Sequence, residues 1–161
     1  MQSDLSLKQY FSGLINSSEQ VPQLAKYLGY AGLIPFVAIA AAIWSFEENS
    51  VNSLHQVLLS YAAIILSFMG AIHWGLAMAS AQIRNSQLGF SVFPPLIAWF
   101  ASFAPMVWNY SLLILTFILL CAFDLIMHRQ NSVPQWYPLL RIPLSVIVVL
   151  SLITAQTNLL F

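Results

Sequence analysis

The strongest constraint on this chain is a series of long apolar runs separated by short polar breaks. Of its 161 residues, 60% are hydrophobic and only 6% are charged, whereas a soluble domain usually carries about 25% charged residues. So few charged side chains cannot cover a water-facing surface, but an apolar exterior is stable when lipid is the solvent. The runs are continuous and do not alternate, which predicts helices rather than a β-barrel.

The polar breaks divide the apolar sequence into five segments. A helix that crosses a membrane needs roughly 17–25 residues. We therefore predict an all-α integral membrane bundle of five transmembrane helices in one domain, residues 26–157. The spans are expected at about residues 26–46, 56–79, 88–103, 111–127 and 138–155. The third and fourth are near the minimum length, and Pro94-Pro95 is expected to interrupt the third.

Residues 1–25 differ from the rest and are predicted to form an N-terminal cytoplasmic tail. Within Leu5–Ile15, apolar residues recur with the spacing of one helix face, which predicts a short amphipathic helix on the membrane surface. A frayed polar tail is the alternative. The first 26 residues lack the features of a cleavable signal and contain no Arg, which argues against a mitochondrial presequence. We expect a bacterial inner membrane.

The basic residues predict the orientation of the bundle. With five spans, all of them fall on one side of the membrane: Lys8, Lys26, Arg84, Arg129 and Arg141. The loops on the other side carry Glu47 and Glu48 and no basic residue. Because basic loops stay in the cytoplasm, the N-terminus is predicted to be cytoplasmic and the C-terminus periplasmic.

Three polar side chains are predicted to lie at membrane depth on three different spans. His73 is in the second span, Asp124 in the fourth and Arg141 near the start of the fifth. Because an unpaired charge in hydrocarbon is costly, we predict an Asp124–Arg141 ion pair with His73 close to it. Two interpretations stay open: a cytoplasm-facing pocket for a lipid head group or quinone-like ring, and a clamp that fixes helix register. Both charged side chains could also reach the interface by snorkelling.

Further residues near this level are candidates for the same pocket. They are Tyr30, Trp74, Pro94, Trp136 and Tyr137. Glycines at 70 and 75, on either side of His73, are expected to let another backbone or a flat ligand approach. The prolines of the third span free backbone carbonyls, so that segment either lines a cavity or only bends the helix.

Several classes of site are not supported by the sequence. A formal net charge of zero gives no electrostatic case for nucleic acid. Cys121 is the only cysteine, so an intrachain disulfide is excluded, and its apolar surroundings suggest a small buried hydrophobe. No metal site is predicted, because Cys, His and carboxylates do not cluster. His55 and His128 are expected at span edges, so a bis-His haem site is not indicated either. No cofactor can be assigned.

Several segments resemble an uncharacterised family of small bacterial membrane proteins, to which an animal mitochondrial transmembrane protein is similar. The segments are Tyr27–Phe36, Phe68–Ala77, Ser91–Trp99 and Pro134–Arg141, together with Asp124. The resemblance covers about residues 26–155. It implies a membrane bundle and candidate positions but no activity.

Two hypotheses about function follow. The first is a non-enzymatic inner-membrane protein that binds a lipid, quinone-like or other hydrophobic small molecule, or that helps to assemble a membrane complex. The second is a small proton-coupled transporter in which Asp124 and His73 titrate. An enzyme with His73 as general base would need a nucleophile or metal partner that the sequence does not offer. Nucleic acid is not an expected partner.

Overall fold

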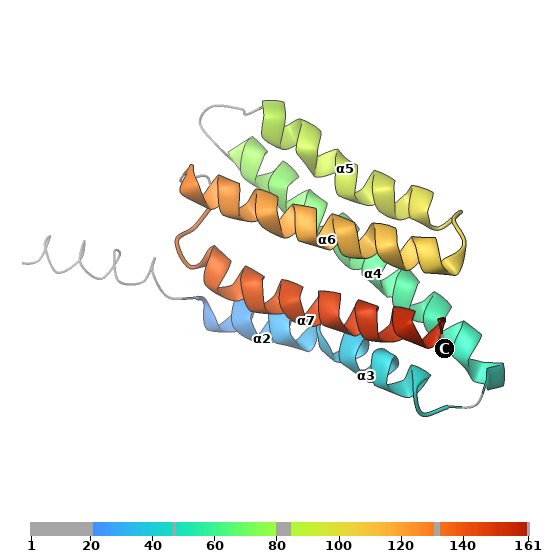
Figure 1. Cartoon of the computed structure of the whole chain (residues 1–161). Helices are drawn as coiled ribbons and strands as arrows, with labels where there is room; N and C mark the ends of the chain where they lie inside the picture. The colour runs from blue at the N-terminus through green and yellow to red at the C-terminus, as the bar shows by residue number, and fades with distance from the viewer. Residues whose placement is uncertain (1–20, 47, 80–84, 131–132, 161) are drawn as a thin grey trace, which may run out of the picture.

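The computed structural model describes residues 21–46, 48–79, 85–130 and 133–160, and within them it is built of helices and contains no strand. The helices are α2 (Gln23–Ala31), α3 (Ile34–Ile43), α4 (Glu48–Ala79), α5 (Asn85–Ala101), α6 (Met106–Arg129) and α7 (Tyr137–Asn158) (Figure 1). The predicted all-α fold class is therefore confirmed. The amphipathic helix predicted at Leu5–Ile15 lies outside the described residues.

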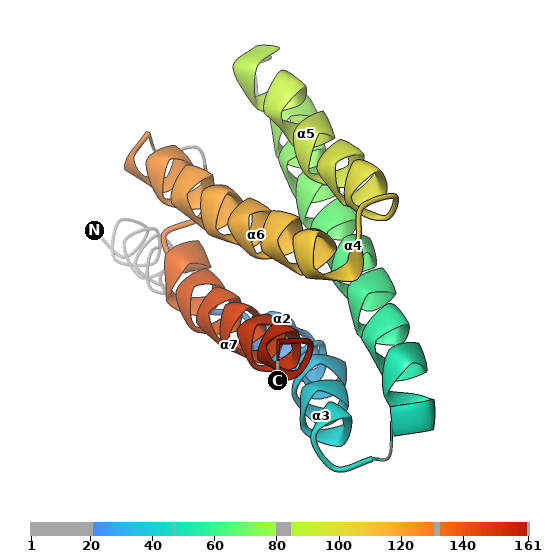
Figure 2. The same cartoon turned by 45° about the vertical axis from the view of Figure 1, so that its right-hand side comes forward.

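The helices run alternately up and down the bundle (Figures 1 and 2). One end holds the starts of α2, α5 and α7 and the ends of α4 and α6; we call it the Arg141 end, after a residue at the start of α7. The other holds the ends of α3, α5 and α7 and the starts of α4 and α6; we call it the Tyr110 end. Consecutive antiparallel helices thus bring residues far apart in sequence to the same level.

The first predicted span consists of two helices, α2 and α3, with a break at Gly32 and Leu33. Pro35 stands in the first turn of α3, and since it has no N–H it cannot bond the carbonyl of Ala31. The break is compensated by α4, because the Tyr61 hydroxyl donates to the Gly32 carbonyl at 3.0 Å. α2 contributes no buried residue, whereas α3 buries Phe36 and two others.

The second helix starts earlier than predicted, at Glu48 instead of residue 56. The polar composition of residues 48–55 suggested a loop, but Val51, Leu54 and Leu58 repeat at helical spacing and pack against the core. With 32 residues, α4 is about 48 Å long, more than the roughly 30 Å of hydrocarbon in a bilayer. His55, expected at a span edge, is consequently buried inside the bundle.

The third span was expected to be interrupted at Pro94-Pro95, and this expectation is wrong, because α5 continues through both prolines. Pro95 cannot donate to the carbonyl of Ser91. That oxygen instead faces α4 at Gly70, where a Cβ would lie only 2.5 Å from it. The glycine therefore allows a close approach of the α5 backbone to α4 at this point. Gly75 plays no such part, because a Cβ there would meet nothing within 4 Å.

Four helical segments are long and apolar enough to cross a membrane: Gln23–Ile43, Ser50–Ala79, Met106–Arg129 and Tyr137–Asn158. The fourth predicted span is thus 24 residues long rather than near the minimum. α5 has 17 residues, at the lower limit for a span. The buried core between the two ends is mostly apolar and includes Leu66, Phe117 and Leu152. It also holds the buried hydroxyls of Thr116, Ser145 and Ser151.

Candidate functional site

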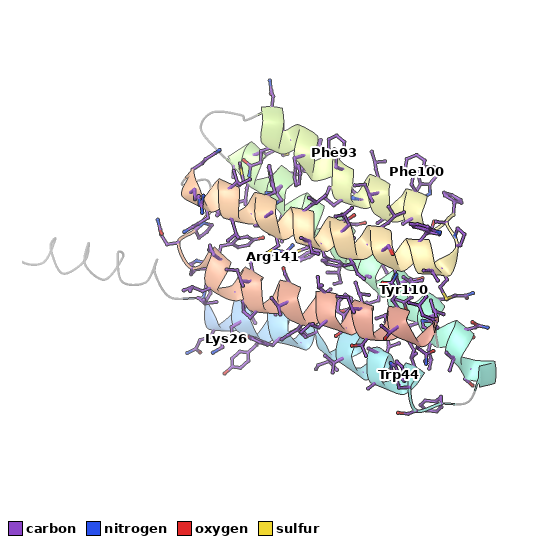
Figure 3. The ribbon with its side chains drawn as sticks, viewed as in Figure 1. Lys26, Trp44, Phe93, Phe100, Tyr110 and Arg141 are labelled. Carbon is purple, nitrogen blue, oxygen red and sulfur yellow. The ribbon has the colours of Figure 1, made fainter. Side chains whose placement is uncertain are left out.

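The three polar residues predicted to meet come together near the Arg141 end. Arg141 Nε donates to Asp124 Oδ2 at 2.5 Å, and His73 Nε2 lies 2.7 Å from Asp124 Oδ1. All three are buried, with His73 and Asp124 1% exposed and Arg141 6%. In Figure 3, Arg141 lies between α6 and α7. We call His73, Asp124 and Arg141 the charged triad; it joins α4, α6 and α7.

Aromatic rings enclose His73 on the side facing α5 and α6. Its imidazole meets Phe123 edge to face at a centroid distance of 5.1 Å and Phe90 at 6.2 Å. Those two rings stack on each other at 3.5 Å. His73 Nε2 and Asp124 Oδ1 are so close that a proton must lie on one of them, because two unprotonated acceptors would repel each other. The rings then fix the imidazole against the carboxylate.

The charged triad leaves buried hydrogen-bonding capacity unused. Arg141 Nη2 and His73 Nδ1 have no hydrogen-bond partner among the described residues. The approach of His73 Nε2 to Asp124 is close but poorly aligned as a hydrogen bond. A buried donor without a partner costs about 1–3 kcal/mol, and more when it is charged. Arg141 can therefore satisfy a further acceptor.

A cavity of about 320 Å³ adjoins Arg141 and is otherwise almost wholly apolar. Its walls come from α2, α3, α4, α6 and α7. They include Leu28, Gly29, Phe36, Met69, Ile72, Phe117, Trp136, Tyr137, Leu140, Leu144 and Val148. Among the residues that the structure describes, Arg141 is the one charged residue lining it. We call it the Arg141 cavity; its chemistry suits an apolar body with one hydrogen-bond-accepting group.

Of the other candidate residues from the sequence, two line this cavity and three do not. Trp136 and Tyr137 line the cavity beside Arg141. Trp74 and Tyr30 are 47% and 42% exposed, respectively, and neither lines it. Pro94 is buried within α5, away from the cavity walls. The glycines that do border the cavity are Gly29 and Gly32, and a Cβ at Gly29 would lie 2.9 Å from Leu144 Cδ1.

A second polar cluster, which sequence reasoning missed, lies near the Tyr110 end. His55 Nδ1 and the Tyr110 hydroxyl are 2.8 Å apart, and His55 Nε2 is 3.4 Å from Asn158 Oδ1. Both His55 and Tyr110 are fully buried. We call these residues the neutral triad. The sequence did contain a pattern that could have predicted this cluster. His55 and His73 lie about five helical turns apart, and hence on one face of a continuous α4.

Metal binding finds no support in the part of the chain that the structure describes. There, no group of three His, Cys, Asp or Glu side chains is placed to hold an ion. His128, in the last turn of α6, is separate from both triads in the interactions that the structure shows, and its buried Nδ1 has no partner among the described residues.

The membrane-spanning part of the chain is similar to known proteins. Residues 21–157 match the family described as protein of unknown function DUF3429. Transmembrane protein 69 of Xenopus tropicalis is 28% identical over 151 residues, covering 89% of this chain and 58% of the relative. Transmembrane protein 69 of Mus musculus is 27% identical over 135 residues, covering 82% and 55%.

This chain thus spans little more than half the length of these curated relatives. No solved structure matches it. The family match extends over nearly all of the described residues, from the start of α2 to the end of α7, and the animal relatives are named as transmembrane proteins. The chain is therefore a helical membrane protein that belongs to the DUF3429 family, whose function is unknown.

Proposed function

We propose that the protein binds an amphiphile in the Arg141 cavity, with a hydrogen-bond-accepting head on Arg141 and an apolar body among α2, α4 and α7. A lipid carbonyl or phosphate and a quinone carbonyl share this chemistry. The observation that carries the proposal is an apolar cavity. In the described part of the chain, Arg141 is its single charged wall residue, and one buried nitrogen of Arg141 has no partner there.

The charges of the triad support this choice of ligand. Asp124 compensates the Arg141 charge through Nε and leaves Nη2 for another acceptor. Arg is suited to this task because its guanidinium offers five donors in a fixed plane. A mostly apolar pocket with a few placed polar groups is the usual form of a small-molecule site. The ligand would thus be oriented by one polar contact and retained by apolar packing.

The apolar interior of the bundle favours binding over transport. Between the two triads most of the described core is apolar, with residues such as Leu66, Phe117 and Val148. The buried hydroxyls of Thr116 and Ser151 are bonded to carbonyls of their own helices and do not form a continuous path. A carrier of protons or ions needs polar groups along its path. A binding protein needs no polar groups along the bundle beyond those at the Arg141 end.

Occupancy of the cavity tests the proposal directly. The protein is purified in mild detergent, and native mass spectrometry measures co-purified molecules in wild type, Ile72→Trp and Ala71→Trp. Ile72 lines the cavity, whereas its neighbour Ala71 is exposed and does not. We expect a bound amphiphile in wild type and Ala71→Trp and little in Ile72→Trp. A wild-type protein free of any amphiphile, or equal occupancy in the two variants, would contradict the proposal.

We further propose that the protein resides in a bacterial inner membrane with the Arg141 end in the cytoplasm. Lys26 and Arg129 support this, because they lie at the same end as Arg141 and basic residues favour the cytoplasmic side. The other two basic residues, at positions 8 and 84, lie outside the described residues. A C-terminal alkaline phosphatase fusion should be active and a C-terminal green fluorescent protein fusion dark; the reverse pattern would invert the topology.

A further inference from the structure

A second hollow lies at the other end of the molecule, between α4 and the hairpin of α5 and α6. It is an open groove of about 780 Å³. Its lining is Gln56, Leu59, Ser60, Ala63, Ile64, Ser67, Pro95, Ala98, Trp99, Ser102, Ala104, Met106 and Asn109. It shares no residue with the Arg141 cavity. We call it the Asn109 groove.

Polar groups gather at one end of this groove. Gln56 and Asn109 are the chain neighbours of His55 and Tyr110, whose side chains are hydrogen-bonded, so both lie at the level of the neutral triad. That level is one turn from the start of α6. The deeper part of the lining, toward the middle of the bundle, includes Ala63, Ile64 and Ala98. The groove therefore passes from polar at the helix ends to apolar inside.

Most polar groups at the outer end are unused by the fold, although the Ser102 hydroxyl donates to the Trp99 carbonyl. Asn109 is 9% exposed, and its carboxamide has no hydrogen-bond partner among the described residues, although it lines the groove. The side chains of Gln56 and Ser60 likewise have none there. By contrast, the hydroxyl of the deeper Ser67 donates to the Ala63 carbonyl of its own helix. The Asn109 carboxamide faces the groove without a partner among the described residues, so it is available to hydrogen-bond a bound group.

The chemistry of the lining defines the class of ligand. A carboxamide both donates and accepts. No charged residue lines the groove within the described ranges of the chain. We propose that the Asn109 groove binds an acyl lipid whose ester carbonyls and hydroxyls pair with Asn109 and Gln56, with its chain along Ile64 and Ala98. Small residues along the groove, such as Ser60, Ala63 and Ala98, would also admit a transmembrane helix. We favour the lipid because its ester carbonyls and hydroxyls offer partners to the carboxamides at the polar end, which the apolar side chains of a helix would not. The lipid belongs to the leaflet opposite the Arg141 cavity.

Photolabelling tests this site independently of the Arg141 cavity. The full-length protein in nanodiscs is exposed to a diacylglycerol carrying a diazirine on its acyl chain, and labelled peptides are quantified for the 56–67 and 95–109 segments. The variants are Gln56→Leu/Asn109→Leu and, as control, Trp108→Leu. Trp108 is 66% exposed and does not line the groove. A hydrogen bond of ordinary strength corresponds to about a five-fold change in affinity.

We expect the double variant to lower labelling of both segments by about five-fold or more and the control to leave it unchanged. A phosphatidylglycerol with the same acyl diazirine should label no better than the neutral lipid. Equal labelling in the double variant, a clear preference for the anionic lipid, or crosslinking of this groove to a second protein chain would overturn the proposal. Ser60→Trp, which fills an exposed position of the groove, should abolish labelling even if the double variant folds poorly.

Discussion

The charged triad and the neutral triad tie the same three helices, α4, α6 and α7, at opposite ends of the bundle. In both, a buried histidine of α4 meets a residue of α6. They differ in charge and in what remains unpaired. The hydroxyl of Tyr110 and both ring nitrogens of His55 have partners, whereas Arg141 Nη2 and His73 Nδ1 have none among the residues that the structure describes.

This difference separates a clamp from a candidate site. A set of neutral groups that satisfy one another adds stability and helix register and offers little to a ligand. An ion pair in the interior costs more to desolvate and often stabilises no better than apolar packing would. The charged triad, beside a cavity and with an unused donor, is therefore the one that needs an explanation other than stability.

The largest expected effect comes from breaking the ion pair on one side only. Asp124→Leu leaves the Arg141 charge buried without a counter-ion and should destabilise the fold by about 3–5 kcal/mol. The double variant Asp124→Leu/Arg141→Leu should recover most of that stability, because no uncompensated charge remains. Unfolding by denaturant in detergent, followed by circular dichroism, measures both.

The same double variant distinguishes the clamp from the site. If Arg141 orients an amphiphile, the stable double variant still loses the co-purified molecule in native mass spectrometry. If the triad is only a clamp, occupancy of the cavity stays at the wild-type level while stability returns. The second result would remove the functional distinction between the two triads.

A smaller effect is expected from the contact between α4 and α5. Gly70→Ala places a Cβ 2.5 Å from Ser91 O and 3.1 Å from Pro95 Cδ. Overpacking of this kind usually costs about 1–3 kcal/mol. Because α5 carries Phe90 against His73, hydrogen exchange should rise around the charged triad more than around the neutral one.

Gly75→Ala is the matched control, since nothing lies within 4 Å of its new Cβ. It should be neutral, or stabilising by up to about 1 kcal/mol through helix propensity. Similar destabilisation by both alanines would show that the close approach at Gly70 is not what positions α5.

The smallest effect should come from the neutral triad. Tyr110→Phe removes the hydroxyl that bonds His55 at 2.8 Å and should cost about 1 kcal/mol, the usual net value of such a bond. Occupancy of the Arg141 cavity should not change, because the cavity lies at the other end. A loss of the amphiphile in this variant would mean that the two ends are coupled, and unfolding curves run in parallel would show whether stability alone explains it.

Sequence reasoning reached the charged triad because its members are conspicuous. A histidine, a carboxylate and an arginine within apolar runs are rare, and alternating helix direction places them at one level. It missed the neutral triad for two reasons. Tyr110 and Asn158 are common residue types near the end of a span, and the polar composition of the first two turns of α4 suggested a loop. The break between α2 and α3 was also missed, although Pro35 provides a local reason for it.

By itself, the sequence determined that this chain folds in lipid, that it is helical, and which polar residues must find partners. Apolar runs without charges require lipid and helices, and isolated polar groups require one another. Only the tertiary structure decided which of those groups are satisfied and which face a hollow. Satisfaction depends on distances and angles between atoms of different helices, so Arg141 beside a cavity and His55 against Tyr110 cannot be told apart until the helices are packed.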